Sequence, residues 1–296
     1  MNTNILTYLV LPEEKGKFLR DLLSRQLNLS HSLVVKLKQQ HKIKVNGELA
    51  RTSHQMQPGD LITIDLELTE QSEIIPEALP LDIIYEDTDF LVVNKPMAMS
   101  THPGNRRLGG TLANAVTHYY QQSGKNRLFR PVNRLDRDTS GLVLIAKSQY
   151  AHQSIFQQVK QHQIERHYFA LVEGVIKKDC GQIDQPIARP DVSRRKRAVH
   201  PKGQSAITHY QVLKRYSDHT YLLLQLETGR THQIRVHLSY VGHPLCGDTL
   251  YGQPSPLLGR QALHAGYISF AHPRTKKQVT LTAPLPRDMQ KALDTL

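Results

Sequence analysis

The chain has little of what several classes of protein require. Its 296 residues contain no tryptophan, and its two cysteines, Cys180 and Cys246, lie far apart with no ligand spacing around them. This use of cysteine fits a reducing cytoplasm and gives no disulfide or metal framework. No apolar run approaches the roughly 18–20 residues of a membrane-spanning helix, and residues 1–10 lack the features of a signal peptide. We therefore expect a cytoplasmic protein with no membrane segment and no metal.

Acidic residues are also in short supply. The chain carries 38 Lys and Arg against 26 Asp and Glu, which gives a formal net charge of +12 at pH 7. Residues 1–70 contribute 9 basic and 8 acidic residues, so a net +11 of that charge belongs to residues 71–296. A charge excess concentrated in this way favours a polyanionic partner, and nucleic acid in particular.

The densest cluster of opposite charges lies in the nonapeptide RLDRDTSGL, residues 134–142, which leads into the apolar segment 143–146. Charges at the mouth of an apolar strand are costly unless they satisfy one another or serve chemistry. A calcium loop is excluded because its twelfth position, normally a bidentate Glu, is Lys147. Two alternatives remain, a structural turn closed by an Arg–Asp pair and a catalytic motif.

Residues 1–70 have the pattern of a small α/β domain. Residues 1–12 are expected to form an extended arm, apolar residues recur at helical spacing over 17–27, and Ser30 offers an N-cap for a second helix. A short strand, an Asn-Gly turn, a Pro-Gly-Asp turn and the alternating strand 61–66 follow. Residues 71–80 change composition, lack periodicity and are expected to be a linker.

This succession of elements resembles, over about residues 15–67, the small RNA-binding domain named after ribosomal protein S-four. The resemblance implies that the second helix and the adjoining loop face RNA. A solvated lysine face is the alternative. Because the unit is nearly neutral in total, any RNA affinity must come from that one face. It carries four lysines suited to phosphate contact, Lys36, Lys38, Lys42 and Lys44.

Residues 81–296 are expected to form the larger domain. Its predicted strands, among them 90–96, 143–146, 168–172, 206–213 and 221–227, outnumber the helices predicted from Thr111 and over 151–163. Short hairpin-like turns are frequent, so we expect a mixed, mainly antiparallel α+β domain and not repeated βαβ units.

The most basic run of the chain covers residues 189–202. We expect it to form a loop that closes on RNA phosphates, and a charged hairpin without that role is the alternative. The residues predicted to make these contacts are Arg194, Arg195, Lys196 and Arg197.

A second informative block is TGRTHQIRVHL, residues 228–238. Thr231 is expected to cap a helix with one apolar face. Arg235 would lie beside that buried stripe, where a guanidinium needs an anionic partner, and Asp136 is the natural candidate.

Three histidines near this helix, His232, His237 and His243, might suggest a metal site, but no carboxylate or cysteine completes a ligand set around them. We expect two of them on the polar face of the helix and one in a turn.

Five segments, taken in chain order, resemble the motifs of the RluA-type pseudouridine synthases. One departure is visible, because Asn133 stands where the family motif has His. Each segment is a weak signal alone, but the ordered set is specific. The segments are RLD at 134–136, RHYFALVEG at 166–174, TGRTHQIRVH at 228–237, GHPLCGDTLYG at 242–252 and LHA at 263–265.

The resemblance implies an enzyme that detaches uracil from ribose, turns it and rejoins it through carbon 5. Asp136 would be the catalytic carboxylate, either as a covalent nucleophile or by stabilising positive charge on the sugar. Arg235 would keep Asp136 ionised, and Tyr168 would stack on the uracil. Since the base must be flipped out of its stack, Arg134 would fill the space that it leaves, and Ile234 would form part of the pocket wall.

The expected partner is structured RNA, ribosomal RNA in preference to transfer RNA, bound by a monomer that needs no metal or organic cofactor. A non-catalytic RNA-binding or ribosome-assembly protein on the same fold is the alternative. A protein of that kind would not need to keep a carboxylate inside a basic cleft. The set Arg134, Asp136, Tyr168 and Arg235 is complete here, which favours the enzyme.

Overall fold

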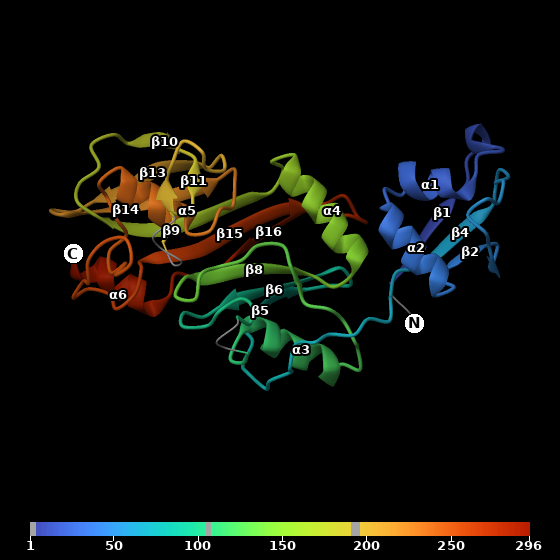
Figure 1. The fold of residues 1–296 in the computed structure, drawn as a ribbon, viewed down its shortest axis with the longest axis horizontal. Coiled ribbons are helices and arrows are strands. Elements are labelled where there is room, and N and C mark those ends of the chain that lie inside the picture. Colours follow the sequence, from blue (N-terminus) through green and yellow to red (C-terminus); the bar gives the residue numbers. More distant parts are fainter. Residues whose placement is uncertain (1–3, 105–107, 191–195) are drawn as a thin grey trace.

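The computed structural model describes residues 4–104, 108–190 and 196–296, and its elements form a small N-terminal group and a larger C-terminal one (Figure 1). The small group contains a four-stranded antiparallel sheet in the order β1-β4-β2-β3. Within the segment expected to be an extended arm, β1 is an extended strand that pairs along its whole length with β4. The elements are β1 (Ile5–Leu9), a 3-10 turn (Pro12–Glu14), α1 (Leu19–Arg25), α2 (His31–Gln39), β2 (Ile43–Val45), β3 (Glu48–Leu49) and β4 (Leu61–Asp65).

Local sequence explains these small elements. The Ser30 hydroxyl accepts a hydrogen bond from the Leu33 amide at 3.3 Å, so it caps α2 as predicted. Asn46 and Gly47 both have positive φ, 52° and 87°, as the tight β2–β3 hairpin requires. Apolar residues from both helices and from β4 fill one core, in which Leu22, Leu37 and Ile64 are fully buried.

The larger group is built on a ten-stranded sheet with the order β10-β13-β14-β9-β15-β8-β6-β5 along its main path, while β7 and β16 pair with β8 and β15. Every pair in it is antiparallel except β15 with β8, which confirms the predicted mixed, mainly antiparallel α+β fold. The strands are β5 (Ile83–Glu86), β6 (Phe90–Lys95), β7 (Arg130–Pro131), β8 (Ser140–Ala146), β9 (Glu165–Glu173), β10 (Cys180–Asp184), β13 (Ile207–Arg215), β14 (His219–Leu226), β15 (Leu263–Ala271) and β16 (Gln278–Thr282).

Helices and a short ribbon complete this domain. Thr111 caps α3 as predicted, whereas α4 begins two residues before the predicted start because Ser148 supplies its cap. In Figure 1 α3 lies beside β5 and β6, and α6 lies near the C-terminus of the chain. The elements are α3 (Leu112–Gln122), α4 (Gln149–Lys160), α5 (Gln233–Tyr240), α6 (Arg287–Thr295) and the ribbon of β11 (Ile187–Ala188) with β12 (Ala198–Val199). No helix within the described ranges combines the length and the apolar character needed to cross a membrane.

The strand β8 is buried along its whole length and separates two cores. Val143 and Ile145 belong to one core, and Leu142 and Leu144 belong to the other, because successive side chains of a strand point to opposite faces. At its start Gly141 has φ of +116°, and a Cβ there would lie 2.2 Å from the carbonyl oxygen of Ala265 in β15. Only glycine therefore allows β8 and β15 to approach at the point where the charged nonapeptide meets the sheet.

The two groups contact each other through polar side chains. Arg274 binds the carboxylate of Asp89 and also reaches the Asn4 side chain at 2.7 Å and the Ile5 carbonyl at 2.8 Å. Arg130 pairs with Glu70. The boundaries 1–70, 71–80 and 81–296 remain predictions.

Candidate active site

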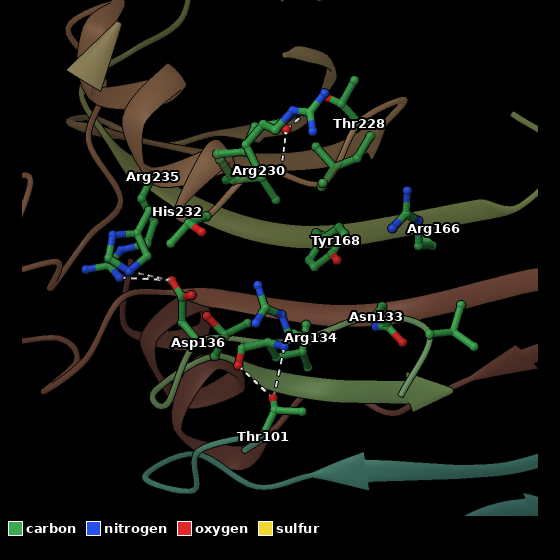
Figure 2. A pocket seen from close by; sticks show the side chains of 18 of the residues that line it. Thr101, Asn133, Arg134, Asp136, Arg166, Tyr168, Thr228, Arg230, His232 and Arg235 are labelled. Carbon is green, nitrogen blue, oxygen red and sulfur yellow. Dashed lines mark hydrogen bonds and ion pairs between the residues drawn. The ribbon is translucent and has the colours of Figure 1, made fainter. Parts of the chain in front are cut away.

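An open cleft of about 1130 Å³ crosses the middle of the large sheet (Figure 2). Its walls come from the nonapeptide, from β9 and from the segment 226–235. The four lysines predicted for the N-terminal domain are not among the described residues that line it, and Lys42 is paired with Asp65 at 2.6 Å. Arg194 and Arg195 lie outside the described residues. The cleft brings together six of the predicted site residues, Arg134, Asp136, Tyr168, Arg197, Ile234 and Arg235.

The predicted contact between Asp136 and Arg235 is present. The Arg235 Nη1 donates to Asp136 Oδ2 at 2.9 Å, and His232 Nε2 lies 3.7 Å from the same oxygen. Asp136 Oδ1 accepts no hydrogen bond from the residues that the structure describes. With its side chain 26 % exposed, the carboxylate is both held and open to the cleft.

Arg235 has a second and stronger partner that the sequence did not reveal. Its Nε and Nη2 donate to the two carboxylate oxygens of Asp248 at 2.7 and 2.8 Å, and Asp248 is only 1 % exposed. Burial alone would lower the pKa of Arg235, but Asp248 and then Asp136 raise it above its usual value. Two carboxylates therefore fix the guanidinium, which remains charged and presents one N–H to Asp136.

The backbone before α5 differs from the prediction. The helix is capped not by Thr231 but at His232, whose φ of 58° places it in the left-handed region. The Gln233 carboxamide accepts from the Arg230 amide at 2.9 Å and from the Thr228 hydroxyl at 2.8 Å, so it closes this turn from inside. The turn places the His232 imidazole next to Asp136.

His237 was also wrongly predicted to lie on the polar face. It is fully buried, and its ring nitrogens contact the Thr208 hydroxyl and the Gln185 carbonyl, each at 2.9 Å. His243 lies in the turn after α5, as expected.

The nonapeptide is anchored from behind. Asn133 accepts from the Leu144 amide at 2.9 Å and donates to the Leu142 carbonyl at 3.0 Å, so its side chain pairs with β8 as a strand would. The Thr101 hydroxyl donates to the Leu135 carbonyl at 2.9 Å and accepts from the Leu135 amide at 3.2 Å. With Leu135 pinned and buried, the side chains on either side of it, Arg134 and Asp136, line the cleft.

A buried lysine that the sequence did not flag supports the same loop. Lys95 is fully buried, and its ammonium donates to the carbonyls of Pro96, Met99 and Arg137 at 2.8, 2.8 and 3.2 Å. Burial lowers its pKa to about 7, although the charges of Asp138 and Asp136 act in the opposite direction. Its position at the end of a buried strand, directly before a proline, was the only signal in the sequence.

Tyr168 stands in β9 between the two sides of the cleft (Figure 2). It is buried, and burial followed by the charge of Asp136 raises its pKa, although Arg166 opposes this. The phenol is therefore neutral at pH 7 and presents an apolar ring with a polar tip.

The cleft is strongly cationic. The described residues that line it include seven Lys and Arg against two acidic residues, Asp136 and Glu227. Four of these cations were not among the predicted site residues, although three of the four stand inside the quoted motifs. They are Arg137, Arg166 and Arg230, within the motifs, and Lys160, outside them. A cleft of this charge attracts phosphates, and Asp136 is one of only two carboxylates among the described residues that line it.

The fold and this cleft define an enzyme that acts on nucleic acid. The RNA pseudouridylate synthase family matches residues 89–240, about half of the chain, and the chain belongs to that family. It is accordingly an RNA pseudouridine synthase, an isomerase that converts uridine in RNA to pseudouridine.

Relatives and solved structures agree with this assignment. The chain is 44 % identical over 259 residues to the uncharacterized RNA pseudouridine synthase YlyB of Bacillus subtilis (strain 168), with 86 % of each chain covered. It is 39 % identical over 270 residues to the ribosomal large subunit pseudouridine synthase D of Yersinia pestis, covering 86 % of this chain and 83 % of the relative. The structure of human RNA Pseudouridylate Synthase Domain Containing 1 superposes with a TM-score of 0.58 at 28 % identity, over 70 % of this chain and 84 % of that one.

Proposed function

We propose that Asp136 carries the isomerisation and that Arg235 positions it. The observation that supports this most directly is the arrangement of the two oxygens. Oδ2 is held by Arg235, while Oδ1 accepts no hydrogen bond from the described residues and faces an arginine-lined cleft. A carboxylate with one oxygen held and the other open suits attack on a sugar carbon or stabilisation of its positive charge.

The reaction breaks the bond between N1 of uracil and C1′ of ribose and forms a bond from C5 to the same C1′. The proton on C5 must leave before pseudouridine is complete. Tyr168 contributes a flat neutral face on which the detached uracil stacks while it turns. Ile234, which lines the cleft and is buried, forms an apolar part of the pocket wall.

Uridine inside folded RNA must be flipped out to reach Asp136. Arg134 is exposed and stands two residues before Asp136 on the loop that Thr101 and Asn133 hold in place. Its planar guanidinium is suited to fill the gap in the base stack, and the short chain distance places it beside the flipped nucleotide.

The substrate is structured RNA, and ribosomal RNA is the preferred target, modified in the cytoplasm. Two observations support this choice. Relatives named ribosomal large subunit pseudouridine synthase D share 37–39 % identity with the chain. The N-terminal group of elements also carries Lys36, Lys38 and Lys44 on its exposed surface, where phosphates can reach them. Arg197 lines the cleft, and the exposed Lys196 directly precedes it in the chain.

The test compares the wild type with Asp136→Asn in the release of tritium from RNA labelled at C5 of uridine, using RNA from cells that lack this gene. The amide is nearly isosteric, so we expect RNA affinity to persist and turnover to fall below detection. Asp138→Asn is the matched control, because that carboxylate lies two residues away and does not line the cleft.

Two results would contradict the assignment. Substantial release by Asp136→Asn would show that another group carries the chemistry. Salt-sensitive RNA binding by the wild type, without release from any RNA, would favour a binding protein that has kept the fold.

A further inference from the structure

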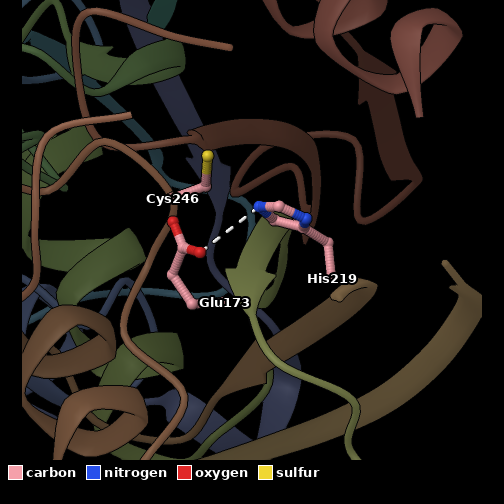
Figure 3. A group of neighbouring side chains, drawn as sticks. All are labelled: Glu173, His219 and Cys246. Carbon is pink, nitrogen blue, oxygen red and sulfur yellow. Dashed lines mark ion pairs between the residues drawn. The ribbon is translucent and has the colours of Figure 1, made fainter. Parts of the chain in front are cut away.

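Three side chains with metal-binding chemistry meet away from the cleft (Figure 3). Glu173 ends β9, His219 begins β14, and Cys246 lies in the loop after α5. Their ligand atoms all lie within 4.8 Å of one another, with His219 Nε2 at 3.3 Å from Glu173 Oε2. None of the three lines the cleft. Their sequence separation explains why the motifs gave no sign of them.

The histidine is oriented for a ligand. Its Nδ1 lies 2.7 Å from Asp218 Oδ1, and because a carboxylate oxygen accepts, Nδ1 is the donor of that hydrogen bond. Nε2 points toward Glu173 and Cys246. It is buried, and it has no hydrogen-bond partner among the residues that the structure describes. An imidazole fixed by a carboxylate on one nitrogen, with the other aimed at a thiol and a second carboxylate, is the usual second shell of a zinc ligand.

The cysteine and the glutamate complete the donor set. Cys246 is fully buried, and its sulfur contacts the Ser255 hydroxyl at 3.1 Å. Glu173 is partly exposed and provides the route by which an ion can arrive from solvent. One sulfur, one nitrogen and one oxygen favour a borderline cation such as Zn²⁺ over Mg²⁺ or Ca²⁺, which require oxygen ligands.

We propose that Glu173, His219 and Cys246 bind a divalent cation of the Zn²⁺ class, with water as the fourth ligand. Binding replaces the thiol proton, which leaves to solvent, and forms bonds from the ion to sulfur, Nε2 and a carboxylate oxygen. This departs from the expectation, drawn from the sequence, that the protein holds no metal.

The β9–β14 ladder already pairs His219 with Glu173, so the site adds the loop of Cys246 to two strands that the sheet joins. The Cys246 amide donates to the Leu171 carbonyl at 2.9 Å, which ties its loop to β9. Asp248, the buried partner of Arg235, follows two residues later on the same loop. An ion bound at Cys246 therefore stabilises the loop that holds the Arg235 guanidinium, which makes the site structural and not catalytic.

The experiment uses the full chain, stripped with a chelator and titrated with Co²⁺, a spectroscopic substitute for Zn²⁺. We expect one Co²⁺ per chain with an intense near-ultraviolet thiolate-to-cobalt band, displaced by Zn²⁺. The band should vanish in Cys246→Ser and His219→Gln and persist in Cys180→Ser, the matched control, because Cys180 is the exposed second cysteine. Zn²⁺ should raise the melting temperature of the wild type and of Cys180→Ser only.

Failure of the wild type to develop the band would overturn the proposal without reference to any variant. Loss of the band in Cys180→Ser, or its persistence in Cys246→Ser, would overturn it as well. In those cases the three residues are only a polar cluster in which His219 lies between Glu173 and Asp218. Because absorbance and melting are read without RNA, neither result bears on the role of Asp136.

Discussion

Asp248→Asn separates the positioning of Asp136 from its chemistry. In the wild type three carboxylate hydrogen bonds hold Arg235, two from Asp248 and one from Asp136. The carboxamide oxygen of the variant can still accept one of the two hydrogen bonds that Arg235 donates at this position. The substitution removes, however, the buried negative charge that faces the guanidinium. Hydrogen bonds to charged groups contribute about 1.5–3 kcal/mol each, and breaking a buried pair costs about 3–5 kcal/mol. We therefore expect the free energy of unfolding to fall by about 2–4 kcal/mol.

The effect on activity follows from the freed guanidinium. With Asp248 neutral, Arg235 is expected to turn toward Asp136 and engage both of its oxygens, including the one that faces the cleft. A displacement of about 1 Å costs on the order of 100-fold in rate. Single-turnover tritium release should slow by about that factor, while the dissociation constant for RNA should stay unchanged because Asp248 does not line the cleft.

Asp288→Asn is the matched control, because Asp288 makes the same two-oxygen pair with Arg260, at 2.7 and 3.0 Å, and does not line the cleft. It should lose stability without a comparable loss of single-turnover rate. A wild-type rate for Asp248→Asn, or equal losses of rate in the two variants, would refute the reasoning.

Two further predictions concern the support of the nonapeptide. Burial lowers the pKa of Lys95 in the folded protein to about 7, against 10.5 for the free side chain. Between these two pH values the unfolded chain binds more protons at this group than the folded protein does. Lys95 therefore makes the free energy of unfolding rise with pH in this range, by at most about 1.4 kcal/mol per pH unit. Denaturant titrations at pH 7 and 9 should show this rise in the wild type and a smaller one in Lys95→Met; identical slopes would contradict it. Gly141→Ala should destabilise the fold by about 3 kcal/mol or more, because the new Cβ meets Ala265 and the positive φ is strained. A melting temperature equal to that of the wild type would show that β8 and β15 can move apart.

Sequence reasoning was most successful where a residue lies within a local pattern. The caps at Ser30 and Thr111 and the Asn46–Gly47 hairpin were predicted because each depends on hydrogen bonds or dihedral angles a few residues apart. The pairing of Arg235 with Asp136 was found by chemistry, since a guanidinium beside an apolar stripe requires an anion.

The remaining site residues could not be read from spacing. Asp248 follows Arg235 by thirteen residues, and only the path of the loop after α5 brings it back. His232 adopts a left-handed backbone that a non-glycine residue rarely shows, so the cap was assigned one position too early. Lys95 meets Arg137 across 42 residues, because the sheet brings the ends of β6 and β8 together.

The position of β15 has a consequence for how the chain folds. This strand lies between β9 and β8, so the sheet consists of two halves that, among the residues described, are joined only by the strand pairing of residues 263–271. Asp136 precedes β8 of one half, while Tyr168 belongs to β9 of the other. Contacts between segments so distant in the chain form late, because loop closure must come first. During synthesis the nonapeptide and β9 are thus complete long before they can face each other. The cleft closes only when residues 263–271 have been made.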